Sequence, residues 1–323
     1  MPLLSKDKPN LCYNSCGMIL VTGGTGFIGQ ALVRNLAALG RPVRILLRPS
    51  AASPQLPQGI PIEVAVSGLR DERGVRAAMK GVTVVYHLAG SERMGSHADL
   101  TGVDIEGTQG IAQAAAQAGV ERLFFISHLG ADRLSAFPVL RAKALAEAAI
   151  RDSGVPYTIF RSGVVFGPGD QFTLPLTKLL RLSPGVFLIP GDGSLTLQPL
   201  WIDDLIACLT WALDDDSMVN QVVEIGGSEY LTYLEIANTL LQAIHIKRIL
   251  VPFPPPLLRN VGLFLEQSSS KFPISLFWLD YLAADRICDV DTLPRLFGLM
   301  PARFSQQLQY LNPPARGAAR RSL

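Results

Sequence analysis

The stretch Val21-Thr22-Gly23-Gly24-Thr25-Gly26-Phe27-Ile28-Gly29 decides how this chain of 323 residues begins to fold. Residues 18–21 are apolar and residues 27–39 repeat apolar side chains at helical spacing, which predicts a strand, a glycine-rich turn and a helix in that order. Glycines let the backbone turn tightly and bring the amide N–H groups at the start of a helix against a pyrophosphate. We therefore expect a dinucleotide to contact Gly23, Thr25, Gly26, Phe27, Ile28 and Gly29; a turn that binds nothing is the alternative.

Residues 43–47 form the second predicted strand, and Arg48 follows it directly. In nucleotide-binding folds this strand ends beside the adenosine ribose, where an acid selects NAD and an arginine accommodates the 2′-phosphate of NADP. This chain has Arg48 there, with Arg44 nearby and no acid. The sequence therefore favours NADP(H) as the cofactor and leaves NAD(H) open. The alternative for Arg48 is a solvated side chain at the end of a strand.

Strands and helices alternate along the first half of the chain, which predicts an α/β fold with a doubly wound parallel sheet. Further strands are expected at residues 62–66, 83–88, 123–127 and 157–160, and helices at residues 72–80, 101–118 and 139–153. Ligands of such sheets bind beyond the carboxyl ends of the strands. We therefore expect Ala89, Gly90, Ser127 and His128 at the same crevice as the glycine-rich turn.

The chain divides into four regions by composition. We expect an N-terminal extension at residues 1–17, a dinucleotide-binding core at 18–165, a mixed C-terminal lobe at 166–312 with segments that return to the core, and a basic tail at 313–323. Within the lobe, the proline-rich residues 252–256 predict a rigid linker. The apolar residues 256–266 are expected to pack against the lobe, and contact with a partner or a membrane surface is the alternative.

Composition excludes several classes of function. A net charge of +2 without a basic stripe argues against nucleic-acid binding. The four cysteines (Cys12, Cys16, Cys208 and Cys288) lack zinc-like spacing, so they are expected as reduced thiols and no metal site is predicted. No run is long enough for a signal peptide or a spanning helix. These features predict a cytoplasmic protein and leave a peripheral membrane association open.

Motifs along roughly residues 18–312 carry a resemblance to a known superfamily. They are Thr22-Gly23-Gly24-Thr25-Gly26-Phe27-Ile28-Gly29, Tyr86-His87-Leu88-Ala89-Gly90, Glu106-Gly107-Thr108, Lys143, Arg161 to Pro168, and Gly191-Asp192-Gly193 to Asp203-Asp204. Together they resemble the extended, NAD-dependent epimerase/dehydratase-like branch of the short-chain dehydrogenases/reductases. The segments Leu197 to Leu205 and Cys288 to Leu299 are similar to an atypical group, which contains NmrA-like proteins and the nucleotide-binding accessory subunit of respiratory complex I.

The chain departs from the catalytic pattern of this superfamily. Active members use a tyrosine, four residues before a lysine, as the proton donor to substrate. Lys143 is present and is expected to hold the nicotinamide ribose, but Val139 stands at the tyrosine position. The usual serine falls on Ser127 or His128, depending on the alignment by one residue, and Asp104 replaces a common asparagine.

Two functions remain after these departures. The sequence favours an NADP(H)-binding accessory protein without turnover, with a protein partner in a membrane redox complex. A bound nucleotide can be kept for stability alone, because a ligand at a hundred times its Kd stabilises the folded state by about 2.7 kcal/mol. The alternative is an oxidoreductase or epimerase-like enzyme for an unknown small molecule, in which His128 acts as the acid-base and Lys143 and Ser127 assist.

Overall fold

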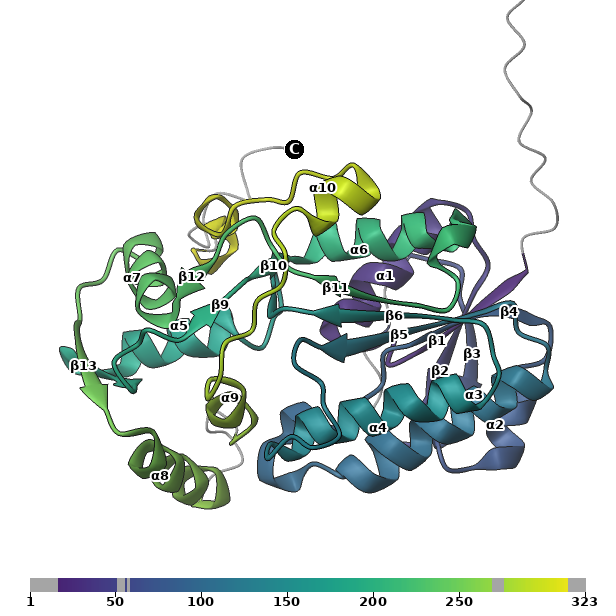
Figure 1. Ribbon diagram of the computed structural model, residues 1–323, viewed down its shortest axis with the longest axis horizontal. Coiled ribbons are helices and arrows are strands. Elements are labelled where there is room, and N and C mark those ends of the chain that lie inside the picture. The colour runs from purple at the N-terminus through teal and green to yellow at the C-terminus, as the bar shows by residue number, and fades with distance from the viewer. Residues whose placement is uncertain (1–16, 51–55, 57–58, 269–275, 313–323) are drawn as a thin grey trace, which may run out of the picture.

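The computed structural model describes residues 17–50, 56, 59–268 and 276–312, and its centre is a seven-stranded sheet with helices on both faces (Figure 1). All pairs in this sheet are parallel, in the order β3-β2-β1-β4-β5-β6-β11. Its strands are β1 (Met18–Thr22), β2 (Val43–Leu47), β3 (Glu63–Val66), β4 (Val82–His87), β5 (Arg122–His128), β6 (Tyr157–Ser162) and β11 (Gln221–Ile225). The strand order reverses between β1 and β4, which is where such sheets bind ligands.

Helices cover the two faces of this sheet. One face packs against α1 (Phe27–Ala38) and α6 (Ile202–Trp211), and the other against α2 (Glu72–Ala78), α3 (Gly107–Gln117) and α4 (Pro138–Asp152) (Figure 1). Neighbouring residues of β1 belong to different cores, since Val21 packs with α1 and α6 while Leu20 packs with α3. Strands buried on both faces are apolar throughout, as the sequence of β1 is. The predicted doubly wound α/β fold is confirmed.

The helix expected at residues 101–118 begins differently from the prediction. Residues Leu100–Glu106 form a π-helix, and α3 follows only from Gly107. The side chain of Asp99 accepts a hydrogen bond from the amide of Gly102 at its start. A π turn holds more residues than an α turn and is frequent at functional sites. Asp104 lies within it and is 2% exposed.

The smaller C-terminal lobe lies beyond the carboxyl ends of β5 and β6 (Figure 1). Three pairs of short strands and several helices build it, while α6 and β11 from the same half of the chain belong to the core. The strand pairs are β7 (Val165–Phe166) with β10 (Leu200–Trp201), β9 (Thr196–Leu197) with β12 (Leu231–Thr232), and β8 (Val186–Pro190) with β13 (Ile249–Phe253). The helices are α5 (Thr173–Leu182), α7 (Tyr233–Ala243), α8 (Pro255–Ser268), α9 (Leu276–Tyr281) and α10 (Thr292–Phe297).

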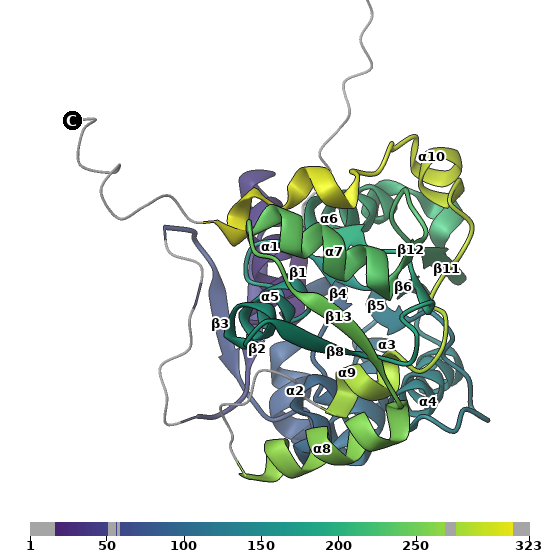
Figure 2. The same cartoon turned by 90° about the vertical axis from the view of Figure 1, so that its left-hand side faces the viewer.

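Short 3-10 helices complete the described elements: Glu92–His97, Ala212–Asp214, Asp216–Met218, Phe304–Gln307 and Gln309–Leu311. The expectation of a linker at residues 252–256 was wrong, because Pro252 and Phe253 belong to β13 and α8 begins at Pro255 (Figure 2). β13 pairs with β8 alone, and an edge strand tolerates a proline that cannot donate a hydrogen bond. The predicted tail at 313–323 and residues 1–16 lie outside the described residues. Within the part that is described, no helix has both the length and the apolar character needed to cross a membrane.

Candidate functional site

The glycine-rich turn joins β1 to α1 at the carboxyl edge of the sheet. The amide of Gly26 donates a hydrogen bond to the carbonyl of Gly23 over 2.9 Å, and Gly26 is the N-cap of α1. Constraints within the protein explain three of the four glycines. Gly23 has a φ of +70°, a Cβ on Gly24 would lie 2.8 Å from the side chain of Ile45, and a Cβ on Gly29 would lie 2.2 Å from the carbonyl oxygen of Gly23. At Gly26 a Cβ would have one neighbour, at 3.2 Å. The missing side chain of Gly26 therefore leaves open space at the helix start, where the N–H groups favour an anion.

A buried hydrogen-bond chain supports this turn from below. The hydroxyl of Thr108 donates to the carbonyl of Asp104 over 2.6 Å, so His87 must donate from Nε2 to Thr108 over 2.9 Å. The Nδ1 of His87 then accepts from the hydroxyl of Thr22 at 2.7 Å. His87 is fully buried, and this burial lowers its pKa to about 3. The neutral imidazole thus connects β1, β4 and α3 just beneath the turn.

Two adjoining cavities run from the turn along the sheet edge. The first, of about 550 Å³, is lined by Gly23, Thr25, Arg48, Ala89 and Gly90 among others. The second, of about 260 Å³, is lined by Gly26, Phe27, Ile28, Gly29, Gly90, His128 and Lys143 among others. Gly90 and Met94 line both cavities. The structure therefore brings every residue predicted to contact the cofactor to one continuous crevice, and the open space at Gly26 fits a pyrophosphate.

Two arginines border the first cavity. Arg48 follows β2 and is exposed, as expected from the sequence. Arg70 follows β3 and is exposed as well. Arg70 pairs with Glu106 at 3.6 Å. Arg44, by contrast, donates to Glu63 and to the carbonyls of Ala78 and Lys80, and it does not line the cavity. Among the described residues, Arg48 and the Glu106-paired Arg70 are thus the cations that line this cavity.

The titratable side chains Glu92, His128 and Lys143 line the second cavity, and Asp104 lies next to them. The Nζ of Lys143 is 3.4 Å from Glu92 and 3.7 Å from Asp104, and the Nε2 of His128 is 3.8 Å from Glu92. Asp104 also accepts two hydrogen bonds from Ser91, at 2.6 and 3.0 Å. Within the described residues, one oxygen each of Glu92 and Asp104 and both ring nitrogens of His128 have no hydrogen-bond partner. Buried polar atoms in proteins are normally paired, so these atoms indicate that a ligand completes the site.

Burial and neighbouring charges shift the pKa values of three of these four side chains in different directions. Burial raises the pKa of Asp104 to about 6, against the influence of Lys143 and with that of Glu92. Burial also acts on Glu92, but Lys143 and His128 stabilise its carboxylate and hold the pKa well below its ordinary value. Burial lowers the pKa of His128, although Glu92 opposes this. Neighbouring groups with pKa values driven apart are typical of acid-base sites.

Ser127 and His128 are adjacent in β5 and therefore point to opposite faces of the sheet. The hydroxyl of Ser127 donates to Glu147 over 2.6 Å, and that fully buried carboxylate also accepts from Arg161 and Arg151. Ser127 does not line the crevice, so the structure does not bring it together with His128 and Lys143. Its role in this network is to satisfy a buried charge.

Helix α9 closes the second cavity, which the sequence did not indicate. Val139, at the position of the missing tyrosine, borders Phe277 and Tyr281 of α9. Tyr281 also lines the cavity that holds His128; its hydroxyl has no partner among the described residues, and burial raises its pKa to about 12. Glu92 was also missed, since nothing in its local sequence points to the crevice. Among the described residues, no group of three or more His, Cys, Asp or Glu side chains is arranged so that it could hold a metal ion.

Comparisons with known proteins agree with this geometry. Residues 23–170 match the family described as NAD(P)H-binding. This match covers just under half of the chain and shows that residues 23–170 are similar to NAD(P)H-binding domains. The fold of the chain is that of the epimerase Mth375 from Methanothermobacter thermautotrophicus, with a TM-score of 0.73, 20% identity, and coverage of 91% of this chain and 90% of that one.

Two curated proteins are similar to this chain over most of its length. The chain is 29% identical to the mitochondrial NADH dehydrogenase (ubiquinone) 1 alpha subcomplex subunit 9 of Arabidopsis thaliana, over 79% of this chain and 65% of that subunit. The chain therefore spans less than two thirds of the length of that relative. It is 27% identical to the ceramide reductase of Caulobacter vibrioides, over 79% of each protein. A subunit of an NADH dehydrogenase and a reductase are thus similar to this chain at nearly the same identity.

Proposed function

We propose that this protein is an NADP(H)-dependent reductase of a carbonyl compound, in which His128 replaces the missing tyrosine as the proton donor. One observation carries this proposal: neither ring nitrogen of the buried His128 has a hydrogen-bond partner among the described residues, Glu92 lies 3.8 Å from Nε2, and the ring borders the same cavity as Lys143. A histidine that served packing alone would be expected to have its ring nitrogens paired.

The residues of the crevice suit the binding of a dinucleotide. The residues that would contact the dinucleotide are Gly23, Thr25, Gly26, Phe27, Ile28, Gly29, Arg48, Ala89, Gly90 and Lys143. When bound, this cofactor supplies a hydride. Arg48 and Arg70 support a preference for NADP(H), because a guanidinium forms strong hydrogen bonds with a phosphate.

Conversion of a carbonyl to a hydroxyl also requires one proton on the oxygen. His128 donates that proton, and the carboxylate of Glu92, 3.8 Å away, stabilises the imidazolium from which it leaves. The ammonium group of Lys143 lies within ion-pair distance of the carboxyl groups of Glu92 and Asp104. Burial raises the pKa of Asp104 to about 6, so its carboxyl group keeps a proton in mild acid beside Lys143.

A second function is supported by Val139 and by the Arabidopsis relative. Without the tyrosine, Lys143 is bound by two carboxylates, and an accessory protein would need its nucleotide only for stability. The name of that relative supports a partner in a membrane redox complex. Such a protein would be cytoplasmic and peripheral to a membrane.

Turnover separates the two functions. We would measure NADPH oxidation by the wild type with a panel of aldehydes and ketones, alongside His128→Gln and the exposed control His97→Gln. The reductase proposal expects turnover in the wild type and in His97→Gln, and its loss in His128→Gln with NADPH affinity retained. NADPH binding without turnover in the wild type, together with co-purification in a larger membrane assembly, would instead support the accessory function.

A further inference from the structure

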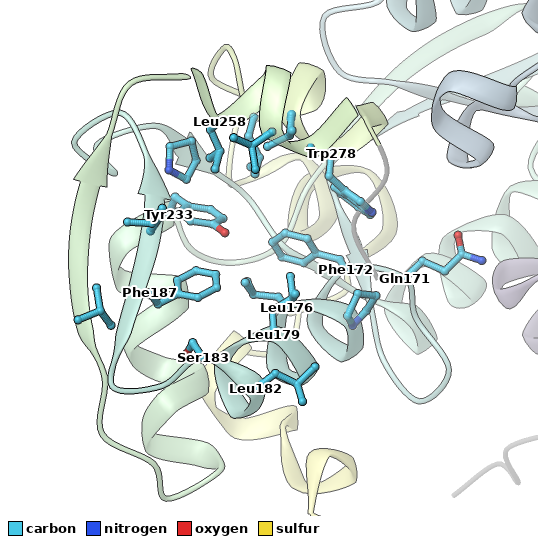
Figure 3. A pocket seen from close by; sticks show the side chains of 18 residues that line it. Gln171, Phe172, Leu176, Leu179, Leu182, Ser183, Phe187, Tyr233, Leu258 and Trp278 are labelled. Atoms are coloured by element: carbon cyan, nitrogen blue, oxygen red, sulfur yellow. The ribbon is translucent and has the colours of Figure 1, made fainter. Parts of the chain in front are cut away.

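A third cavity, of about 400 Å³, lies in the C-terminal lobe (Figure 3). Its walls come from α5, β8, α8 and α9, with Leu176 and Leu179 on one side and Leu258 and Trp278 on another. None of its 18 lining residues is charged, and most are aliphatic or aromatic. Its volume lies within the range of about 300–1,000 Å³ that is typical of small-molecule sites.

This apolar cavity adjoins the one that contains His128. Gln171 and Trp278 line both of them. Apolar side chains are also left exposed around the lobe cavity, among them Leu182 at 68% and Val261 at 49%. A ligand could therefore extend from the cofactor crevice, past Trp278, into an apolar environment that continues to the protein surface.

We infer that this cavity binds the long hydrocarbon chain of a lipid-like substrate, whose carbonyl end lies at His128. This inference rests on the proposed reductase function. A sugar nucleotide does not fit the cavity, because its charges and hydroxyl groups would be buried without partners. An aliphatic chain makes no such demand, and burial of each of its methylene groups is favourable.

The test is a displacement titration with Nile red, competed by 2-octanone, 2-decanone and 2-dodecanone. Each added methylene should lower the Kd about fourfold until the cavity is filled. Leu179→Trp and Leu258→Trp fill the cavity from α5 and α8 respectively, and both positions are half-buried, so a larger ring can be accommodated. Leu134→Trp makes the same exchange at a side chain that is 93% exposed.

We expect the gain in affinity with chain length in the wild type and in Leu134→Trp, and its loss in the two blocking variants. NADPH titration of all four proteins reports whether each is folded. Equal ketone affinity in the wild type and in both blocking variants, or no dependence on chain length, would overturn the assignment. Binding that follows chain length without any NADPH oxidation would reject the reductase function and leave the cavity assignment standing.

Discussion

Gly26→Asp is the perturbation that tests the cofactor crevice most directly. Gly26 has a φ of −76° and a ψ of 172°, which any residue adopts, and a Cβ there would meet only the carbonyl oxygen of Gly23, at 3.2 Å. Such an exchange can even stabilise a fold by about 0.4–1 kcal/mol through the unfolded chain. We therefore expect a change in Tm of no more than a few degrees.

The effect on cofactor binding should be much larger. A carboxylate placed ~4 Å from one phosphate charge, at an effective dielectric constant of about 20, is repelled by about 4 kcal/mol. That energy corresponds to an affinity about a thousandfold weaker. Gly29→Ala is the matched comparison, because its Cβ would lie 2.2 Å from the oxygen of Gly23 and the turn itself must move. It should lower both Tm and affinity.

The assay is a fluorescence titration with NADPH and, in parallel, NADH, combined with thermal unfolding of each variant. Loss of binding with an unchanged Tm in Gly26→Asp would identify the open space at Gly26 as the pyrophosphate position. Wild-type affinity in Gly26→Asp would refute the reasoning, as would a loss of stability equal to that of Gly29→Ala.

Three further predictions follow from the site. Arg48→Asp should weaken NADPH binding 10- to 100-fold, since a charge-assisted hydrogen bond contributes roughly 1.5–3 kcal/mol, and should spare NADH; equal losses for both nucleotides would contradict a 2′-phosphate contact. Because burial lowers the pKa of His128 from 6.5, its protonated form becomes abundant only at a lower pH, so kcat/KM for reduction should continue to rise as the pH falls below 6.5. The same rise in His128→Gln would exclude His128 as the donor. Glu147→Gln should lower the free energy of unfolding in urea by about 1.5–3 kcal/mol, because charge-assisted hydrogen bonds from Arg161 are lost while Arg161 keeps its pair with Glu224, whereas the exposed control Glu72→Gln should change it by less than about 0.5 kcal/mol.

Local patterns in the sequence predicted the sheet and the cofactor turn well. The strand at residues 43–47 and the start of α1 at Phe27 match the structure, because apolar spacing and glycines act within a few residues. Lys143 was found from the resemblance to the superfamily pattern, in which a lysine follows the tyrosine position by four residues. The π turn at Leu100–Glu106 escaped prediction, since one additional residue in a turn leaves the apolar pattern nearly unchanged.

The remaining part of the site depends on contacts between distant segments. Glu92 belongs to a short 3-10 helix and Tyr281 to α9, and both reach the second cavity only because α9 packs over that helix. No spacing rule connects residues so far apart. The sequence also left open whether Ser127 or His128 of β5 faces the crevice. Ser127 donates a hydrogen bond to Glu147 on the other face of the sheet, so His128 faces the crevice.

The hydrogen bonds of His87 to Thr22 and Thr108 make the stability of the folded protein sensitive to acid. Above pH 6.5 the imidazole is neutral in both the folded and the unfolded chain, and it causes no penalty. Between pH 6.5 and about 3, His87 is protonated in the unfolded chain but not in the folded one. The free energy of unfolding therefore decreases as the pH is lowered, by about 5 kcal/mol over the whole interval. Since His87 holds Thr22 and Thr108 together beneath the glycine-rich turn, protonation that drives unfolding in acid would separate the strands that carry the cofactor.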